Sequence, residues 1–275
     1  MPCLSGICGL QILTNFQPLT RFSSRGILVL RMDELTNRQL KILKNIVEEY
    51  IETAEPVGSE LLDKKFSLGI SPATIRNEMG ELTRLGYLTQ PHVSAGRSPT
   101  PKALKLYVSN LMEPKKMSVT DEVKSKEKIW DYKTEFQKAL REATRELAET
   151  SKSLAVSADD QGDSYYAGTA NILNMPEFFD IDLTRNVLSL LDRFDYLDKM
   201  FSPMENEGET CILLGEDLGY DYLSPCGLVF TRFGKGQKYQ GVIGVLGPYR
   251  LNYQRVVPAV KYFGRLIDEL ETNLV

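Results

Sequence analysis

The first regular pattern along the chain is a stripe of apolar residues after Thr36. Apolar side chains recur there at the three- and four-residue intervals of one helix face: Leu40, Leu43, Val47 and Tyr50. Thr36 and Gln39 have the spacing of a capping box, in which each side chain bonds the other residue's backbone N–H. We therefore expect a helix that begins after Thr36 and ends near Ala54, before Pro56 restricts the backbone.

Two more helices are expected before residue 86. Ser59 can cap a short helix that runs through Phe66. Ser71-Pro72 combines an N-cap serine with proline at the first helical position, which strongly favours a helix start. Gly86 is expected to end this helix, because glycine is favoured just past a helix terminus. The expected buried face of this third helix holds Ile75, Met79 and Leu82.

The next segment has the pattern of a strand, a polar loop and a return. Tyr87–Thr89 is typical of a short strand, and His92–Pro99 has the Gly and Ser content of a hairpin tip. Thr100-Pro101 then starts another helix. Three helices followed by a strand, a polar loop and a return predict a winged helix-turn-helix.

The residues beyond 112 predict a different architecture. After a linker at 113–116, apolar residues recur near a 3.5-residue period over 121–154. This period fits either a coiled-coil seam between subunits or one face of an amphipathic helix. The other expected elements are a loop over 159–164, a helix over 177–201, strands over 210–214, 227–233 and 239–246, and a final helix over 253–270. Strands grouped between helices predict an α+β domain.

These patterns divide the chain into three parts. We expect a winged-helix DNA-binding domain at residues 33–112 and a regulatory and dimerisation domain at residues 121–275. Residues 1–31 contain no Asp, Glu or Lys and lack the basic start of a secretory signal. We interpret them as an extension upstream of a start at Met32, and expect DNA binding to survive their removal.

Positive charge is local rather than spread over the chain. The net charge of −4 argues against a protein that coats DNA by bulk attraction. Residues 71–116, however, hold seven basic and three acidic side chains, which is a local charge of +4. A local basic surface is what a site-specific DNA-binding module needs.

The exposed face of the helix that starts at Ser71 carries the candidate DNA-reading residues. Arginine suits guanine O6 and N7, asparagine suits adenine N6 and N7, and Thr or Ala can contact a thymine methyl. The helix N-terminus can bind a phosphate, and a small wing tip with one arginine can enter a minor groove. A solvated helix face is the alternative, and the neighbouring wing favours DNA. The predicted DNA contacts are Ser71, Ala73, Thr74, Arg76, Asn77, Gly96 and Arg97.

Other chemistries find little support in the sequence. Four cysteines and one histidine, His92, form neither a zinc pattern nor a disulfide pattern, and Cys211 and Cys226 lie in apolar runs that predict burial. No nucleophile–base set or phosphate-loop spacing is present. We therefore expect no enzyme, no metal and no cofactor. The low cysteine count fits a reducing cytoplasm, where we expect the protein to act. No apolar stretch has the length of a membrane span, and we expect no membrane partner.

Short segments in both halves of the chain form a recognisable set. They are Leu35–Leu43, Glu55–Ser59, Ser71–Met79, Leu85–Leu88, Ala95–Arg97, Gly168–Leu173, Pro176–Phe178, and Gly241–Arg250 with Tyr253. Together they closely resemble the heat-inducible transcription repressor HrcA family, over about residues 33–270 in two blocks. The resemblance implies a winged helix followed by a GAF-like domain with an inserted dimerisation domain. It also implies a homodimeric repressor of heat-shock chaperone operons that binds double-stranded DNA at an inverted-repeat operator, with a GroEL-type chaperonin as a partner.

The chain departs from that family in two places. Family members carry a long segment between the equivalents of Leu154 and Gly168, where this chain has only a short loop. The inserted domain and some GAF-like strands are therefore expected to be missing, so dimerisation would use another surface. Tyr249 and Leu251 also stand where the family usually has Thr and Met, which can alter whatever that loop does.

Two other function classes stay open on the sequence. A ligand-sensing winged-helix regulator of a different regulon would bind a metabolite in its α+β domain. A thermal-shift screen with metabolites distinguishes this class, because ligand binding raises the melting temperature. An enzyme with a winged-helix appendage is disfavoured by the lack of an assembled nucleophile, metal or phosphate motif.

Overall fold

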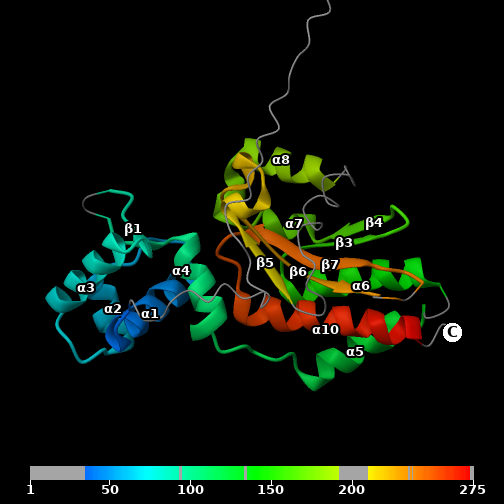
Figure 1. The fold of residues 1–275 in the computed structure, drawn as a ribbon, viewed down its shortest axis with the longest axis horizontal. Coiled ribbons are helices and arrows are strands. Elements are labelled where there is room, and N and C mark those ends of the chain that lie inside the picture. The colour runs from blue at the N-terminus through cyan, green and yellow to red at the C-terminus, as the bar shows by residue number, and fades with distance from the viewer. Residues whose placement is uncertain are drawn as a thin grey trace, which may run out of the picture.

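A helical N-terminal module and a helix-covered sheet lie side by side in the computed structural model (Figure 1). The structure describes residues 35–92, 95–132, 135–191, 210–234, 236 and 238–272. The expected upstream extension, residues 1–31, lies outside these described residues. The extended residues 112–118 join the two parts.

The N-terminal module is the winged helix that the sequence predicts. Its elements are α1 (Asn37–Thr53), α2 (Ser59–Phe66), α3 (Pro72–Arg84), β1 (Leu88–Thr89), β2 (Ser98–Pro99) and α4 (Pro101–Leu106). The Thr36–Gln39 capping box is present, and Ser71 caps α3. The predicted cap of α2 is wrong by one residue, since Gly58 is its N-cap and Ser59 is the first helical residue. β1 and β2 pair antiparallel and form the base of the wing.

The single helix expected over residues 121–154 is wrong. After a π-helical turn at Tyr107–Leu111, the structure has two helices, α5 (Val119–Trp130) and α6 (Phe136–Ser151), and Leu154 is the first residue of a strand. Ile129 of α5 and Phe136 of α6 are both buried in one core. The apolar period continues across the break because both helices face that core. The described residues therefore contain no helix long enough for the coiled-coil seam.

Five antiparallel strands form the C-terminal sheet in the order β4-β3-β7-β6-β5. They are β3 (Leu154–Asp159), β4 (Ser164–Ala167), β5 (Cys211–Leu214), β6 (Cys226–Phe233) and β7 (Gly241–Pro248). β5, β6 and β7 match the three predicted strands, and the predicted polar loop joins β3 to β4. β3 and β4 were not predicted. All six residues of β3 are buried, so it lacks the alternation that marks a strand with one wet face.

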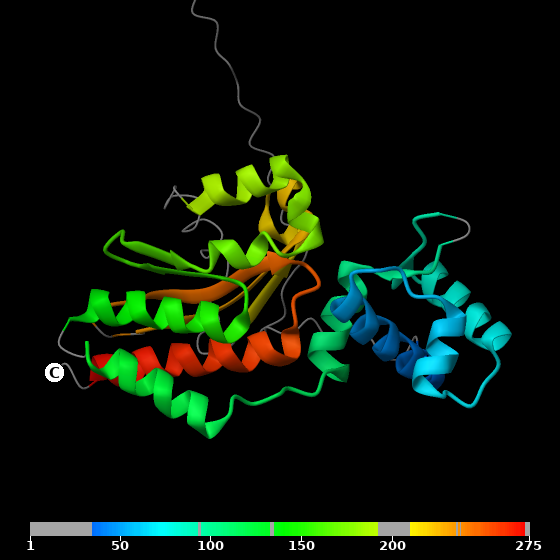
Figure 2. The ribbon, with the colours of Figure 1, turned by 180° about the vertical axis from the view of Figure 1, so that it is seen from behind.

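Helices cover both faces of this sheet (Figures 1 and 2). α6 and α10 (Tyr253–Thr272) pack on one face, where Val229 and Val245 point into the larger hydrophobic cluster. The other face, with Leu228 and Leu246, packs against α7 (Thr169–Ile172), a 3-10 turn (Pro176–Phe179) and α8 (Ile181–Leu191). Short 3-10 turns at Gly215–Leu218 and Asp221–Leu223 follow β5. This arrangement confirms the α+β class.

Three smaller expectations can be compared with the structure. The helix predicted over residues 177–201 begins in the structure as the 3-10 turn and continues as α8. The predicted residues beyond 191 lie outside the described part of the chain. Cys211 and Cys226 are buried free thiols, and burial raises the pKa of Cys226 to about 12. Among the helices described here, none combines the length and apolarity needed to cross a bilayer.

Candidate nucleic-acid interface

One face of α3 packs on the winged-helix core and the other faces solvent. Ile75, Met79 and Leu82 are buried, as predicted. On the opposite side, Arg76 and Asn77 are exposed, and neither side chain has a hydrogen bond or ion pair with any residue in the described part of the chain. Unused donors at the start of an exposed helix are suited to bind groups on another molecule.

The first turn of α3 is held by its own side chains. The Ser71 hydroxyl accepts a hydrogen bond from the Thr74 N–H at 3.2 Å and shares a second one with the Thr74 hydroxyl at 2.9 Å. Ala73 is exposed beside them, while Thr74 is half-buried. The cap therefore fixes the helix start and leaves the small side chain of Ala73 on the surface.

The wing returns beside the loop that follows α1. The backbones of Arg97 and Val57 exchange two hydrogen bonds, both 2.9 Å long. A Cβ on Gly96 would lie 2.5 Å from the Val57 carbonyl carbon, so this packing within the protein requires glycine. The sequence predicted Gly96 as a DNA contact and did not identify Val57 as its packing partner. The one sequence feature that marks Val57 is its place in the Glu55–Ser59 segment. The predicted tip residues Val93 and Ser94 lie outside the described residues.

Two arginines from different elements approach each other at this face. Partial burial lowers the pKa of Arg97, and the positive charge of Arg76 lowers it further. Arg76 belongs to α3 and Arg97 to the wing, so tertiary structure brings their charges together. A phosphate near both guanidinium groups would relieve this repulsion.

Three other basic residues of the 71–116 segment have side-chain partners within the protein, whereas Lys115 and Lys116 are exposed in the linker. Arg84 pairs with Glu81 at 2.8 Å, and the Lys102 ammonium donates to the Leu85 carbonyl at 2.9 Å. Lys105 pairs with Asp217 of the C-terminal part at 2.5 Å. The local charge of the sequence therefore overstates the free charge, which at this face belongs to Arg76 and Arg97.

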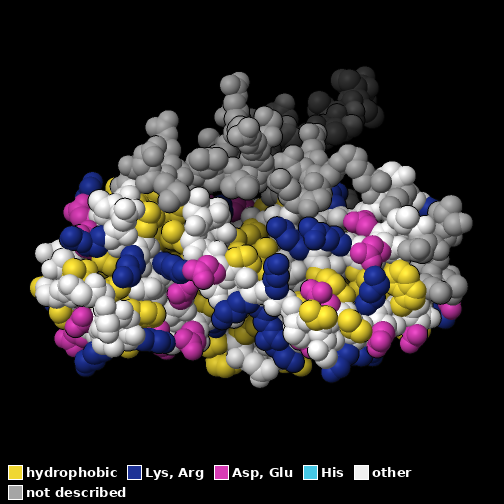
Figure 3. Space-filling model, turned by 90° about the horizontal axis from the view of Figure 1, so that it is seen from below, with side chains coloured by type: hydrophobic (Ala, Val, Ile, Leu, Met, Phe, Trp, Pro, Cys, Tyr) yellow, Lys and Arg dark blue, Asp and Glu magenta, His cyan; other side chains and the backbone are white. Residues whose placement is uncertain are grey.

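Charge elsewhere on the surface is mixed. The view from below shows basic and acidic side chains interspersed across both parts of the molecule (Figure 3). His92 is exposed near the wing. In the described residues, no three His, Cys, Asp or Glu side chains group as they would around a metal ion.

Comparison with known proteins places the chain among regulators. Residues 103–257 match the sequence profile described as the HrcA protein C terminal domain. The heat-inducible transcription repressor HrcA of Desulforudis audaxviator is 30% identical, and the alignment covers 87% of this chain and 99% of the relative. The protein of the same name from Clostridium tetani is 27% identical over 90% of this chain and 97% of its own length.

The lengths of these alignments bear on the missing insert. The first extends over 341 positions, although this chain has only 275 residues. The relative therefore carries residues with no counterpart here, in agreement with the predicted loss of an inserted segment.

A solved structure supports the fold independently. A crystal structure described only as that of a hypothetical protein superposes with a TM-score of 0.69 at 19% identity, and covers 88% of this chain and 100% of its own. The fold class of a winged helix-turn-helix followed by a GAF-like α+β domain is confirmed. With more than half of its length matched to the family profile and a relative at 30% identity along most of the chain, the protein belongs to the HrcA family of heat-inducible transcription repressors.

Proposed function

We propose that this protein represses heat-shock chaperone genes by inserting α3 into the major groove of an operator. Arg76 and Asn77 read base edges there, and Arg97 reaches the adjacent minor groove or its phosphates. Ser71, Ala73 and Thr74 lie at the phosphate-facing start of the helix. The observation that carries the proposal is the exposed, unpartnered pair Arg76 and Asn77 beside the wing arginine. Residues 33–112 supply DNA binding and residues 121–275 supply regulation.

A homodimer on an inverted repeat is the second part of this proposal. Two copies related by a two-fold axis would place two α3 helices in successive major grooves, about 34–36 Å apart. The family relationship supports this arrangement and supports a GroEL-type chaperonin as the partner that favours the DNA-binding form. It also supports action in the cytoplasm, where the DNA and the chaperonin are.

Fluorescence anisotropy tests the proposal directly. Purified full-length protein is titrated with a duplex carrying a chaperone-operon inverted repeat and with a scrambled duplex, at two salt concentrations. We expect tight binding to the repeat only, and an affinity that falls as salt rises because phosphate contacts release counterions. Equal, weak and salt-sensitive binding to both duplexes would overturn the operator assignment. Added chaperonin should strengthen repeat binding without strengthening scrambled-duplex binding.

A further inference from the structure

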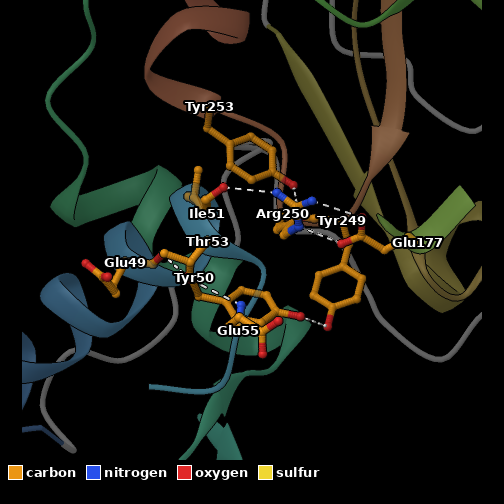
Figure 4. Close-up of polar contacts among 9 residues, drawn as sticks. All are labelled: Glu49, Tyr50, Ile51, Thr53, Glu55, Glu177, Tyr249, Arg250 and Tyr253. Atoms are coloured by element: carbon orange, nitrogen blue, oxygen red, sulfur yellow. Dashed lines mark hydrogen bonds and ion pairs between the residues drawn. The ribbon is translucent and has the colours of Figure 1, made fainter. Parts of the chain in front are cut away.

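The turn between β7 and α10 contacts the end of α1 (Figure 4). This turn belongs to the C-terminal part of the chain, and α1 belongs to the winged helix. Five residues make the contact, and we call them the interdomain clamp: Tyr50, Ile51, Glu177, Tyr249 and Arg250. The sequence placed Tyr50 on the apolar face of the first helix and Glu177, Tyr249 and Arg250 in the family-like segments, but it assigned none of the five to a contact between domains.

Arg250 is the centre of the clamp. Its Nε and one terminal nitrogen donate to the two carboxylate oxygens of Glu177, at 2.5 and 3.0 Å. The remaining nitrogen donates to the Ile51 carbonyl at 3.0 Å. Ile51 lies in the last turn of α1, where carbonyls have no partner within the helix and the helix dipole is negative. One guanidinium thus ties the 3-10 turn of one part to the helix end of the other.

Two tyrosines hold the same junction. The Tyr50 and Tyr249 rings are stacked with centroids 6.3 Å apart, and their hydroxyl oxygens are 3.0 Å apart. Burial and the hydrogen bond to Tyr249 raise the pKa of Tyr50, so its hydroxyl stays neutral and keeps its proton for this bond. The Tyr253 hydroxyl donates a hydrogen bond to the Tyr249 carbonyl, which fixes the backbone of the turn between β7 and α10.

A second line of contacts runs along the start of α10. The Gln254 side-chain amide donates to the Tyr107 hydroxyl at 2.9 Å, and that hydroxyl donates to Glu48 of α1 at 3.3 Å. The linker joins this line, because the Lys115 N–H donates to the Gln254 carbonyl at 2.9 Å. The junction therefore has polar contacts at several points, which add to one cluster of buried apolar side chains that extends from the winged helix into the C-terminal part.

α1 connects the clamp to the recognition helix. It has 17 residues and is about 25 Å long, and the Ile51 carbonyl in its last turn accepts a hydrogen bond from Arg250. Near its other end, Arg38 pairs with Glu78 of α3 at 3.3 Å. A change in how Arg250 holds α1 therefore changes the direction in which α3 points.

We propose that the interdomain clamp fixes the angle between the winged helix and the C-terminal domain, and so sets the half-site spacing that the repressor accepts. The half-site part of this inference rests on the proposed function, since it requires a dimer on an inverted repeat. The clamp residues act as positioning residues and touch no DNA. Glu177 belongs to the 3-10 turn on the far face of the sheet, so the clamp also connects that turn to α1.

Two measurements test the clamp, one with DNA and one without. In the first, affinities are measured for a single half-site and for inverted repeats whose spacer is lengthened or shortened by one base pair. In the second, spin labels at Glu60→Cys and Arg265→Cys, in a chain with Cys3 and Cys8 replaced by Ser, report the distance between the two parts. The test variants are Arg250→Met and the double variant Tyr50→Phe/Tyr249→Phe, which keeps both rings. Arg255→Met is the matched control, because Arg255 is exposed on α10 and lies outside the clamp.

We expect the unaltered clamp and the control to give one narrow distance and a preference for one spacer. The test variants should broaden the distance and reduce the preference by about tenfold, with half-site affinity kept within about twofold. An unchanged distance and an unchanged spacer preference in both test variants would overturn the inference. If the unaltered protein fails to distinguish the repeat from scrambled DNA, the proposed function fails instead, and the distance measurement still decides whether the clamp fixes the angle. The double tyrosine variant decides the outcome if Arg250→Met fails to fold.

Discussion

Two arginines in this protein have opposite surroundings. Arg76 on α3 is exposed and has no hydrogen bond or ion pair in the described part of the chain, whereas Arg250 in the clamp uses both edges of its guanidinium on Glu177 and Ile51. Only 11% of the Arg250 side chain is exposed, so leaving its donors unused would be unfavourable. An arginine whose three guanidinium nitrogens each donate a hydrogen bond inside the fold serves the structure, and one left free beside a second cation is available to a ligand.

The comparison predicts opposite effects of removing each arginine. Loss of Arg250 should act on stability and on domain orientation, while loss of Arg76 should act on DNA recognition alone.

Arg250→Ala should lower the free energy of unfolding by about 3 kcal/mol, because it leaves the Glu177 carboxylate mostly buried without its cation and removes the partner of the Ile51 carbonyl. Urea unfolding followed by circular dichroism measures the change. Arg250→Ala combined with Glu177→Ala should recover part of the loss, since no unpaired charge remains. A single variant as stable as the parent would contradict the structural role of this arginine.

Arg76→Ala and Asn77→Ala should each reduce operator discrimination by about 1–3 kcal/mol and leave the melting temperature unchanged, because both side chains are exposed and make no hydrogen bond or ion pair in the described part of the chain. Anisotropy titrations against operator and scrambled duplexes measure the effect. Arg84→Ala is the control, since Arg84 lies in the last turn of α3 and pairs with Glu81. If Arg84→Ala weakens discrimination as much as Arg76→Ala, the assignment of the reading face is wrong.

Two glycines near the proposed DNA face should respond differently to alanine. At Gly96 the added Cβ would lie 2.5 Å from backbone carbon of Val57, so Gly96→Ala should destabilise the protein by about 2 kcal/mol. At Gly80, inside α3, a Cβ meets nothing within 4 Å, and Gly80→Ala should stabilise the protein by about 1 kcal/mol through helix propensity. Thermal melts measure both changes. Weaker operator binding by the more stable Gly80→Ala would indicate that DNA approaches this position closely.

The smallest effect concerns a carboxyl group of the C-terminal part. Burial raises the pKa of Asp268, and the hydrogen bond from the Gly234 N–H offsets this only in part. The folded protein thus binds this proton more tightly than the unfolded chain does. The resulting stabilisation is fully present below the ordinary Asp pKa and is lost as pH rises through the raised pKa. Asp268→Asn should flatten this part of the pH dependence of unfolding, and identical pH profiles for the two proteins would contradict it.

The winged helix was predictable from the sequence because its signals are local. The capping box at Thr36, the Ser71-Pro72 start and the Gly86 stop each depend on residues within one turn of the helix terminus. The face of α3 that carries Arg76 and Asn77 followed from the positions of Ile75, Met79 and Leu82 by helix periodicity alone.

The C-terminal part was less predictable because its elements are buried on both sides. β3 reads as a continuation of the preceding helical stripe, since all of its residues face a core and none marks a wet side. The break between α5 and α6 was hidden for a related reason. Both helices cover the same core, so their apolar period runs on across the turn.

Short-range sterics and hydrophobic periodicity were enough to predict three features: the helix termini of the winged helix, the α+β class and the residues that α3 presents to solvent. Two contacts depend on tertiary packing. Arg97 lies close enough to Arg76 for the Arg76 charge to lower the pKa of Arg97, and Arg250 reaches the Ile51 carbonyl 199 positions away along the chain. Such pairings depend on how separate elements pack, and no local pattern of residues encodes the distance between them.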